Sequence, residues 1–294
     1  MEREVDQWMR RMRRGEFAAA WELGDRMIES RRGARCYDKP RHEQFVWDGA
    51  PIEGKRVLVR CYHGLGDTLQ TARFFPRVAA LARSCTVWVQ PPLIPLLRLQ
   101  PEMPKLAPLH DGSPDVDFDV DIESMELAHL FRVTPEEAGD SVPYLRVEPR
   151  VTAAPQGHRR VGLIWRAGDW DPSRSIPFEL LAPLFEVEGV TYVSLQREPA
   201  VTEPRMQLPA GCDDPIETAR LMCGLDLVIS VDTMTAHLAG ALGLPAWILL
   251  PRDCDWRWMD DRDDSPWYPT ARLWRQPQSR RWEPVVTAVA AALR

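Results

Sequence analysis

The stretch LDLVISVDTMTAHLAGALGLPAWILLP (residues 225–251) decides the fold, because it predicts a strand, a helix and another strand in direct succession. Residues 227–231 form a continuous apolar run, which is typical of a parallel strand covered on both faces. Residues 234–242 follow as a helix, Gly243 suits a left-handed C-cap, and Pro245 ends the helix. With residues 246–250 as the next strand, the pattern predicts a parallel α/β domain.

The turn between the first strand and the helix is a candidate binding site. Asp232 and Thr233 stand where the helix begins, and both residue types accept hydrogen bonds from unpaired helix N–H groups. A helix N-terminus at the carboxyl end of a strand also favours a phosphate. The two residues could equally serve as caps and nothing more. His237, one turn into the helix, favours a site for a phosphorylated ligand.

The α/β pattern occurs twice along the chain, which predicts two Rossmann-like domains facing one cleft. Predicted strands lie at 57–61, 86–90, 161–165 and 191–196, with helices at 68–82, 178–185 and 216–223. Residues 149–157 have linker composition. The expected organisation is an N-terminal helical segment over 1–45, a first domain over 46–150 and a second over 151–294.

Two further loops are expected to carry chemistry. In YHGLGD (62–67), Gly64 and Gly66 permit close backbone approach or positive φ, and Asp67 is an N-cap candidate. The loop lacks a full G-x-G-x-x-G and is a weak dinucleotide signal, but a carboxylate there can act as a general base on a hydroxyl. In RAGDWDPSRSIP (166–177), Arg166, Arg174 and Ser175 can neutralise a departing diphosphate, although an ordinary surface loop has the same composition.

Two other segments allow more than one interpretation. DVDFDVDIE (115–123) contains the D-x-D repeats of some metal-dependent nucleotide-sugar enzymes, but its alternation favours a half-buried strand with one solvated acidic face. The segment 253–276 is dense in Trp, Asp and Arg. Its Trp256, Trp258 and Trp267 either stack on a sugar or base or pack between the domains.

Composition excludes several classes of protein. The net charge of −6 argues against a general nucleic-acid binder. Six scattered cysteines without metal-ligand spacing, and an N-terminus that is charged from the start, favour a protein of the cytoplasm. The basic cluster within residues 10–14 is either a solvated helix face or a peripheral contact with a membrane.

Six segments together resemble glycosyltransferase family 9, the heptosyltransferase-like enzymes, and above all bacterial members fused to tetratricopeptide-like helices. They are residues 47–76, 161–168 (VGLIWRAG), 174–177 (RSIP), 193–196 (VSLQ), 225–251 and 265–276. Residues 15–23 (GEFAAAWEL) also resemble one helix of a tetratricopeptide repeat. The resemblance implies a GT-B architecture and inverting transfer of a sugar from a nucleotide-diphosphate donor, such as ADP-heptose, without an essential metal or other cofactor.

The resemblance also assigns roles. Asp67 would deprotonate the acceptor hydroxyl, with His63, Gly64 and Gly66 on the acceptor side. The donor side would comprise Arg166, Arg174, Ser175, Gln196, Asp232, Thr233, Met234 and His237. The acceptor, whether a glycan, a lipid-linked glycan or a protein, stays open. Two alternatives remain: an inactive nucleotide-sugar-binding or scaffold protein, and a sugar-nucleotide epimerase or hydrolase of the same fold.

Overall fold

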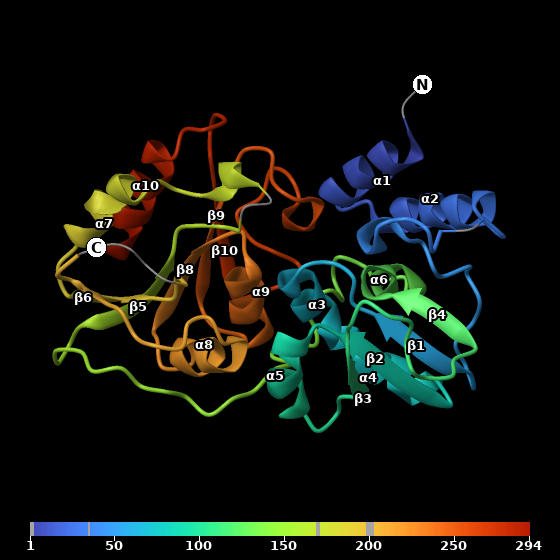
Figure 1. Ribbon diagram of the computed structural model, residues 1–294. Helices are drawn as coiled ribbons and strands as arrows, with labels where there is room; N and C mark the ends of the chain where they lie inside the picture. The colour runs from blue at the N-terminus through green and yellow to red at the C-terminus, as the bar shows by residue number, and fades with distance from the viewer. Residues whose placement is uncertain (1–2, 35, 169–170, 198–202) are drawn as a thin grey trace. The chain divides into compact units, whose positions relative to one another are not determined.

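The structure, a computed structural model, describes residues 3–34, 36–168, 171–197 and 203–294. The chain divides into two compact units, Met1–Ser141 and Val142–Arg294, and each is considered by itself. Figure 1 shows the helices and strands of both. The division lies before the 149–157 linker. Residues 142–150 pack with the second unit, where the N–H groups of Tyr144 and Leu145 donate to the Ala241 carbonyl.

The first unit is built around a parallel four-stranded sheet. Its strands are β1 (Arg56–Arg60), β2 (Ser84–Val89), β3 (Lys105–Pro108) and β4 (Val120–Glu123), in the order β3-β2-β1-β4. Between them run α3 (Leu65–Thr71), η2 (Ala72–Phe74), α4 (Phe75–Leu81), η3 (Pro91–Leu93) and α5 (Ile94–Arg98). After β4 come η4 (Ser124–Glu126) and α6 (Leu127–Leu130). The order changes direction at β1, which has β2 on one side and β4 on the other.

The N-terminal helices are part of this first unit. They are α1 (Glu4–Arg13) and α2 (Phe17–Ser30), followed by η1 (Arg41–Glu43), and they lie within the segment 1–45 that was expected to be helical. The buried Trp21 donates its indole N–H to the Val133 carbonyl at 2.8 Å and stacks on His129. Arg31 pairs with Glu126 at 2.7 Å. The helical segment is therefore fastened to the region of α6 by specific polar contacts.

The second unit contains a parallel six-stranded sheet in the order β10-β9-β8-β5-β6-β7. The strands are β5 (Arg159–Ile164), β6 (Val190–Ser194), β7 (Met206–Gln207), β8 (Leu227–Val231), β9 (Ala246–Leu250) and β10 (Ala271–Arg275). The helices are η5 (Pro172–Arg174), η6 (Phe178–Leu181), α7 (Ala182–Phe185), α8 (Pro215–Met222), α9 (Met234–Ala241), η7 (Trp256–Trp258) and α10 (Glu283–Leu293). In Figure 1 the pair α7 and α10 and the pair α8 and α9 lie on opposite sides of the sheet.

This strand order is that of a doubly wound sheet, in which successive strands are added on either side of a central pair. In the second unit the central pair is β5 and β8, and in the first it is β1 and β4. Ligands of doubly wound sheets bind outside the carboxyl ends of that central pair. All five residues of β8 are buried, as its apolar run predicted, and Gly243 has the expected positive φ of 68°.

Three predictions need correction. The first helix after β1 begins at Leu65, with Gly64 as its N-cap, so Asp67 lies inside the first turn and is not the cap. Gly64 has a φ of −69°, so positive φ is not used there. The acidic stretch 115–123 is a strand only over Val120–Glu123, and its Asp121 is buried against Arg60 instead of facing solvent.

Candidate functional site

The loops singled out in the second unit follow the central strands of its sheet. The loop that starts at Arg166 follows β5, Asp232 and Thr233 follow β8, and Gln196 follows β6 on the other side of β5. Because parallel strands end at one edge of a sheet, these residues gather at the carboxyl edge of three adjacent strands. Residues 169–170 of the first loop lie outside the described residues.

Hydrogen bonds join these loops to one another. Arg174 Nη1 donates to the Asp232 carbonyl at 3.1 Å, which ties the loop after β5 to the end of β8. The Arg166 N–H donates to Gln196 Oε1 at 3.0 Å, and the Ala167 N–H donates to Ser175 Oγ at 3.0 Å. The side chains of Gln196 and Ser175 therefore shape the loops. The exposed Arg166 and the partly exposed Arg174 supply the positive charge.

The N-terminus of α9 presents polar groups at the same edge. Thr233 is the N-cap, and its Oγ1 accepts from the Thr235 N–H at 3.3 Å. Thr233 and Met234 are partly exposed, whereas the rest of α9 is buried. The cap function predicted for Thr233 is confirmed. The half-exposed first turn and the nearby Arg174 form an edge suited to an anion.

Asp232 and His237 are buried beside each other. Asp232 Oδ1 lies 3.9 Å from His237 Nε2, and both side chains are about 5% exposed or less. The Tyr268 hydroxyl lies 2.9 Å from His237 Nδ1, and the Trp258 ring stacks on the imidazole at 5.4 Å. Asp232, His237 and Tyr268 thus form a chain of buried polar groups behind the edge. His237 therefore lies behind Asp232 and is not at the surface.

The charge of Asp232 depends on this environment. The pKa of the Asp232 carboxyl is raised to about 6, chiefly by burial and also by the neighbouring Asp255. The cations of Arg257 and Arg174, with the Trp258 indole, act in the opposite direction. The carboxylate is therefore ionised at neutral pH and becomes protonated as the pH falls below about 6.

The tryptophan-rich segment packs inside the second unit. Trp256, Trp258 and Trp267 are all less than 10% exposed, and the rings of Trp256 and Trp267 meet edge to face at 6.1 Å. Trp258 thus lies behind Asp232. Its ring is fully buried and cannot stack on a sugar or base. Sequence reasoning also missed Arg257 and Tyr268, because nothing in the local pattern links them to a helix some twenty to thirty residues earlier.

Gly240 is needed for this packing. A Cβ added there would lie 2.1 Å from Cδ1 of the buried Tyr268 ring. We expect Gly240→Ala to lower the free energy of unfolding by about 1–3 kcal/mol, because the overpacking cost exceeds the gain in helix propensity of about 1 kcal/mol. Urea denaturation would measure it, with Gly168→Ala as control, since a Cβ at Gly168 meets nothing within 4 Å. A more stable Gly240→Ala protein would contradict the packing described.

In the first unit, Asp67 lies in the first turn of α3, after β1. Asp67 Oδ2 accepts from the Gly64 N–H at 2.9 Å, so the carboxylate also closes the turn at the helix start. Gln90, which follows β2, donates to the His63 carbonyl at 2.7 Å and accepts from Thr68 Oγ1 at 3.0 Å. Gly66 lies inside α3. The residues predicted for the acceptor side are thereby brought together at the carboxyl edge of this sheet.

Glu123, the last residue of β4, faces the same turn and was not predicted as a site residue. Its Oε1 accepts from the Tyr62 N–H at 3.3 Å, and its Oε2 lies 3.8 Å from His63 Nε2. Burial raises the pKa of Glu123 to about 8, and Glu126 raises it as well, while the N–H groups of Met125 and Tyr62 lower it. Sequence analysis did not predict Glu123 as a site residue, because it ends an alternating acidic stretch whose acidic face was expected to be solvated.

Aspartates before and within β4 form ion pairs with arginines. Asp117 and Asp119 bind Arg56, and Asp121 binds Arg60. Among the described residues, no three His, Cys, Asp or Glu side chains gather as a metal site would require. Arg56 and Arg60 are thus the ion-pair partners of Asp117, Asp119 and Asp121.

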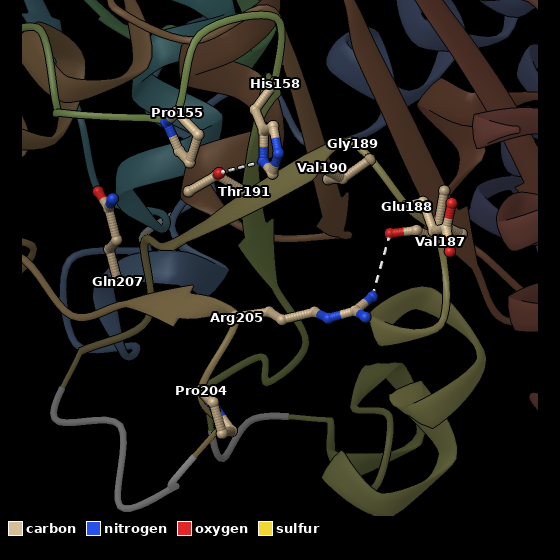
Figure 2. Close-up of a pocket in the computed structure, with 10 residues that line it drawn as sticks. All are labelled: Pro155, His158, Val187, Glu188, Gly189, Val190, Thr191, Pro204, Arg205 and Gln207. Carbon is tan, nitrogen blue, oxygen red and sulfur yellow. Dashed lines mark hydrogen bonds between the residues drawn. The ribbon is translucent and has the colours of Figure 1, made fainter.

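A pocket of about 390 Å³ lies elsewhere in the second unit, and Figure 2 shows the residues that line it. It is lined by His158, Thr191 and Arg205, among others, and so lies at the amino ends of β5 and β6. Ligands of doubly wound sheets bind at the opposite edge. The pocket is therefore separate from the candidate site.

Comparison with known proteins supports the fold class. The chain resembles glycosyl transferase family 9 from Veillonella parvula DSM 2008, with a TM-score of 0.51 and 12% identity over 77% of this chain and 87% of that one. It also resembles the ADP-heptose lps heptosyltransferase II of E. coli, with a TM-score of 0.50 and 13% identity over 81% and 99% of the two chains. The fold is thus a parallel-sheet α/β fold similar to that of the heptosyltransferases.

Two further comparisons complete this picture. The heptosyltransferase TibC, solved in complex with ADP-D-beta-D-heptose, has a TM-score of 0.50 and 14% identity over 83% of this chain and 76% of TibC. Protein FlbA of Caulobacter vibrioides is 27% identical over an alignment of 333 positions, which covers 95% of this chain and 53% of FlbA. The chain therefore spans about half the length of this curated relative. No known family profile matches the chain.

The described helices include none that is both long and apolar enough to cross a membrane. The arginines of the basic cluster, Arg10, Arg11, Arg13 and Arg14, lie at the end of α1 or directly after it, and all but Arg13 are exposed.

Proposed function

We propose that the protein is an inverting, metal-independent glycosyltransferase that moves a sugar from a nucleoside-diphosphate donor to an acceptor hydroxyl. One observation carries the proposal: Arg174 and the N-terminus of α9 meet at the switch point between β5 and β8. A helix N-terminus and a guanidinium are groups that stabilise a diphosphate leaving group. ADP-heptose is the first donor to test, because the similarly folded TibC was solved with it.

The proposed reaction assigns a separate task to each unit. The acceptor oxygen attacks the anomeric carbon as the bond from that carbon to the diphosphate oxygen breaks, and Asp67 of the first unit takes the hydroxyl proton. The positive groups of the second unit, Arg174 and the first turn of α9, stabilise the charge that develops on the diphosphate. Asp232, ionised at neutral pH, accepts hydrogen bonds from hydroxyl groups of the donor sugar. Its orientation is maintained by His237.

The fold and the cysteine content lead us to place the enzyme in the cytoplasm, with a nucleotide sugar and an acceptor as its partners. The direct test is release of nucleoside diphosphate from ADP-, UDP- and GDP-sugars, with magnesium and with EDTA. Transfer that continues in EDTA supports the proposal. Release without any acceptor product would favour a hydrolase, and strict dependence on magnesium would refute the metal-independent mechanism.

One observation favours a second function, a nucleotide-sugar-binding protein without turnover. Asp67 Oδ2 accepts from Gly64, and a capping role by itself explains a carboxylate at this position. Such a protein would bind a nucleoside diphosphate as tightly as an enzyme does. It would release no product at any pH.

The two arginines of the loop after β5 can be distinguished by substitution. We expect Arg174→Gln to weaken binding of the nucleoside diphosphate about 10- to 100-fold, because a charge-assisted hydrogen bond contributes about 1.5–3 kcal/mol. The matched variant Arg166→Gln tests the other cation, whose guanidinium lies on the exposed side of the loop. Isothermal titration in EDTA measures both. If only Arg166→Gln weakens binding, the role that we assign to Arg174 is wrong.

A further inference from the structure

A buried carboxyl group lies behind the turn that we assign to the acceptor side. Glu123 ends β4, and the turn 61–64 follows β1. These two strands are the central pair of the first sheet, where the Arg60 position of β1 is in register with Glu123 of β4. The carboxyl ends of such a pair form the ligand-binding edge of a doubly wound sheet. Glu123 is thus at the switch point of the first unit.

Glu123 contacts both the backbone and a side chain of the turn. Its Oε1 accepts from the Tyr62 N–H at 3.3 Å, and its Oε2 lies 3.8 Å from His63 Nε2. The rest of its contacts hold the carboxyl group in place: the Met125 N–H donates at 2.6 Å and Ser124 Oγ at 3.2 Å. The side chain is 4% exposed, whereas that of His63 is 35% exposed. The buried Glu123 carboxyl group, held by these hydrogen bonds, therefore lies beside the half-exposed His63 imidazole.

The same turn is held from its other side. Gln90, after β2, donates to the His63 carbonyl and accepts from Thr68 of α3. His63 is followed by Gly64, whose N–H binds the carboxylate of Asp67. A displacement of Tyr62 and His63 would therefore move the start of α3 and the proposed base.

We propose that Glu123 is a positioning residue for the acceptor side, which orients the His63 imidazole toward the acceptor and fixes the turn before Asp67. The inference rests on the proposed function for its catalytic consequence, but the contact between Glu123 and His63 can be tested without it. The titratable groups around Glu123 are Cys61, His63 and Glu126, and Glu126 is itself paired with Arg31. Glu126 is the matched control, because it is a neighbouring, largely buried glutamate whose ion pair is with α2 and not with the turn.

The first arm of the test is spectroscopic. In protein labelled at histidine, the His63 ring signal is identified by its absence in His63→Gln, a substitution at a half-exposed position. We expect Glu123→Gln to shift this signal at pH 7, and Glu126→Gln to leave it in place. A His63 signal unmoved by Glu123→Gln, or moved equally by both substitutions, would overturn the proposal.

The second arm measures release of ADP from ADP-heptose with water as the acceptor, which also requires a base. We expect Glu123→Gln and His63→Gln each to slow release about tenfold with unchanged affinity for ADP, and the double variant to be no slower, because the two residues act as one unit. If the fold-decreases in the release rate of the two single variants multiply in the double variant, Glu123 does not act through His63. If the wild type releases no ADP to water, the same comparison is made with an acceptor that supports transfer, and the histidine signal by itself decides whether Glu123 positions His63.

Discussion

Asp67→Asn is expected to slow sugar transfer about 100- to 10,000-fold, the range that general-base catalysis contributes. Asparagine cannot take the acceptor proton, but its amide oxygen can still accept from the Gly64 N–H, as Asp67 Oδ2 does at 2.9 Å. The start of α3 should therefore survive the substitution. The measurement is kcat for transfer at saturating donor.

Two controls make the result decisive. The affinity for the nucleoside diphosphate should not change, because the proposed diphosphate contacts belong to Arg174 and α9. The thermal midpoint should change little, because the turn keeps its hydrogen bond. A transfer rate equal to that of the wild type would refute the assignment of Asp67 as the base. Asp67 would then serve only to accept the Gly64 N–H at the start of α3.

The second large effect concerns the pH dependence of stability. Burial raises the pKa of Glu123 from its ordinary 4.5 to about 8. Between these two values the unfolded chain has lost a proton that the folded protein retains, so the free energy of unfolding falls as the pH rises through this window. One pKa unit corresponds to about 1.4 kcal/mol, which makes the total on the order of 5 kcal/mol.

Glu123→Gln removes this contribution. We expect the variant to gain stability relative to the wild type as the pH rises from 5 to 9, with most of the change complete near pH 8. Chemical denaturation at pH 5, 7 and 9 measures the difference. The altered hydrogen bond to Met125 changes the absolute value but not its pH dependence. Parallel pH profiles of the two proteins would show that Glu123 ionises in the folded state as it does in the unfolded chain.

The sequence predicted the second unit best where local signals agree. The strand, helix and strand within 225–251 were placed within a residue of their bounds, because an apolar run, a cap, a glycine and a proline each mark a boundary. The same reasoning placed one loop directly after β5 and the other directly after β8. Strand order, which makes this edge the switch point, came only from the structure.

The failures have physical causes as well. Gly64 caps α3 through its backbone position, so the helix starts at Leu65, three residues before the start that the pattern suggested. The alternating sequence around Asp121 and Glu123 predicts a solvated strand face. In the folded protein both side chains are buried, and Asp121 pairs with Arg60. Tyr268 reaches His237 across 31 residues of chain, which no periodicity reveals. Buried polar networks are contributed by distant segments and are therefore the part that sequence patterns miss.

In the proposed site, Arg174 and the start of α9 bind the diphosphate of a nucleotide sugar. The most direct test is the thermal stability of the protein with ADP, UDP, GDP and CMP and their sugar conjugates, each with magnesium and with EDTA. A ligand at one hundred times its Kd should add about 2.7 kcal/mol. We predict that one nucleoside diphosphate stabilises the wild type as much in EDTA as in magnesium, and that it stabilises Arg174→Gln less. Stabilisation by none of them, or only with magnesium, would contradict it.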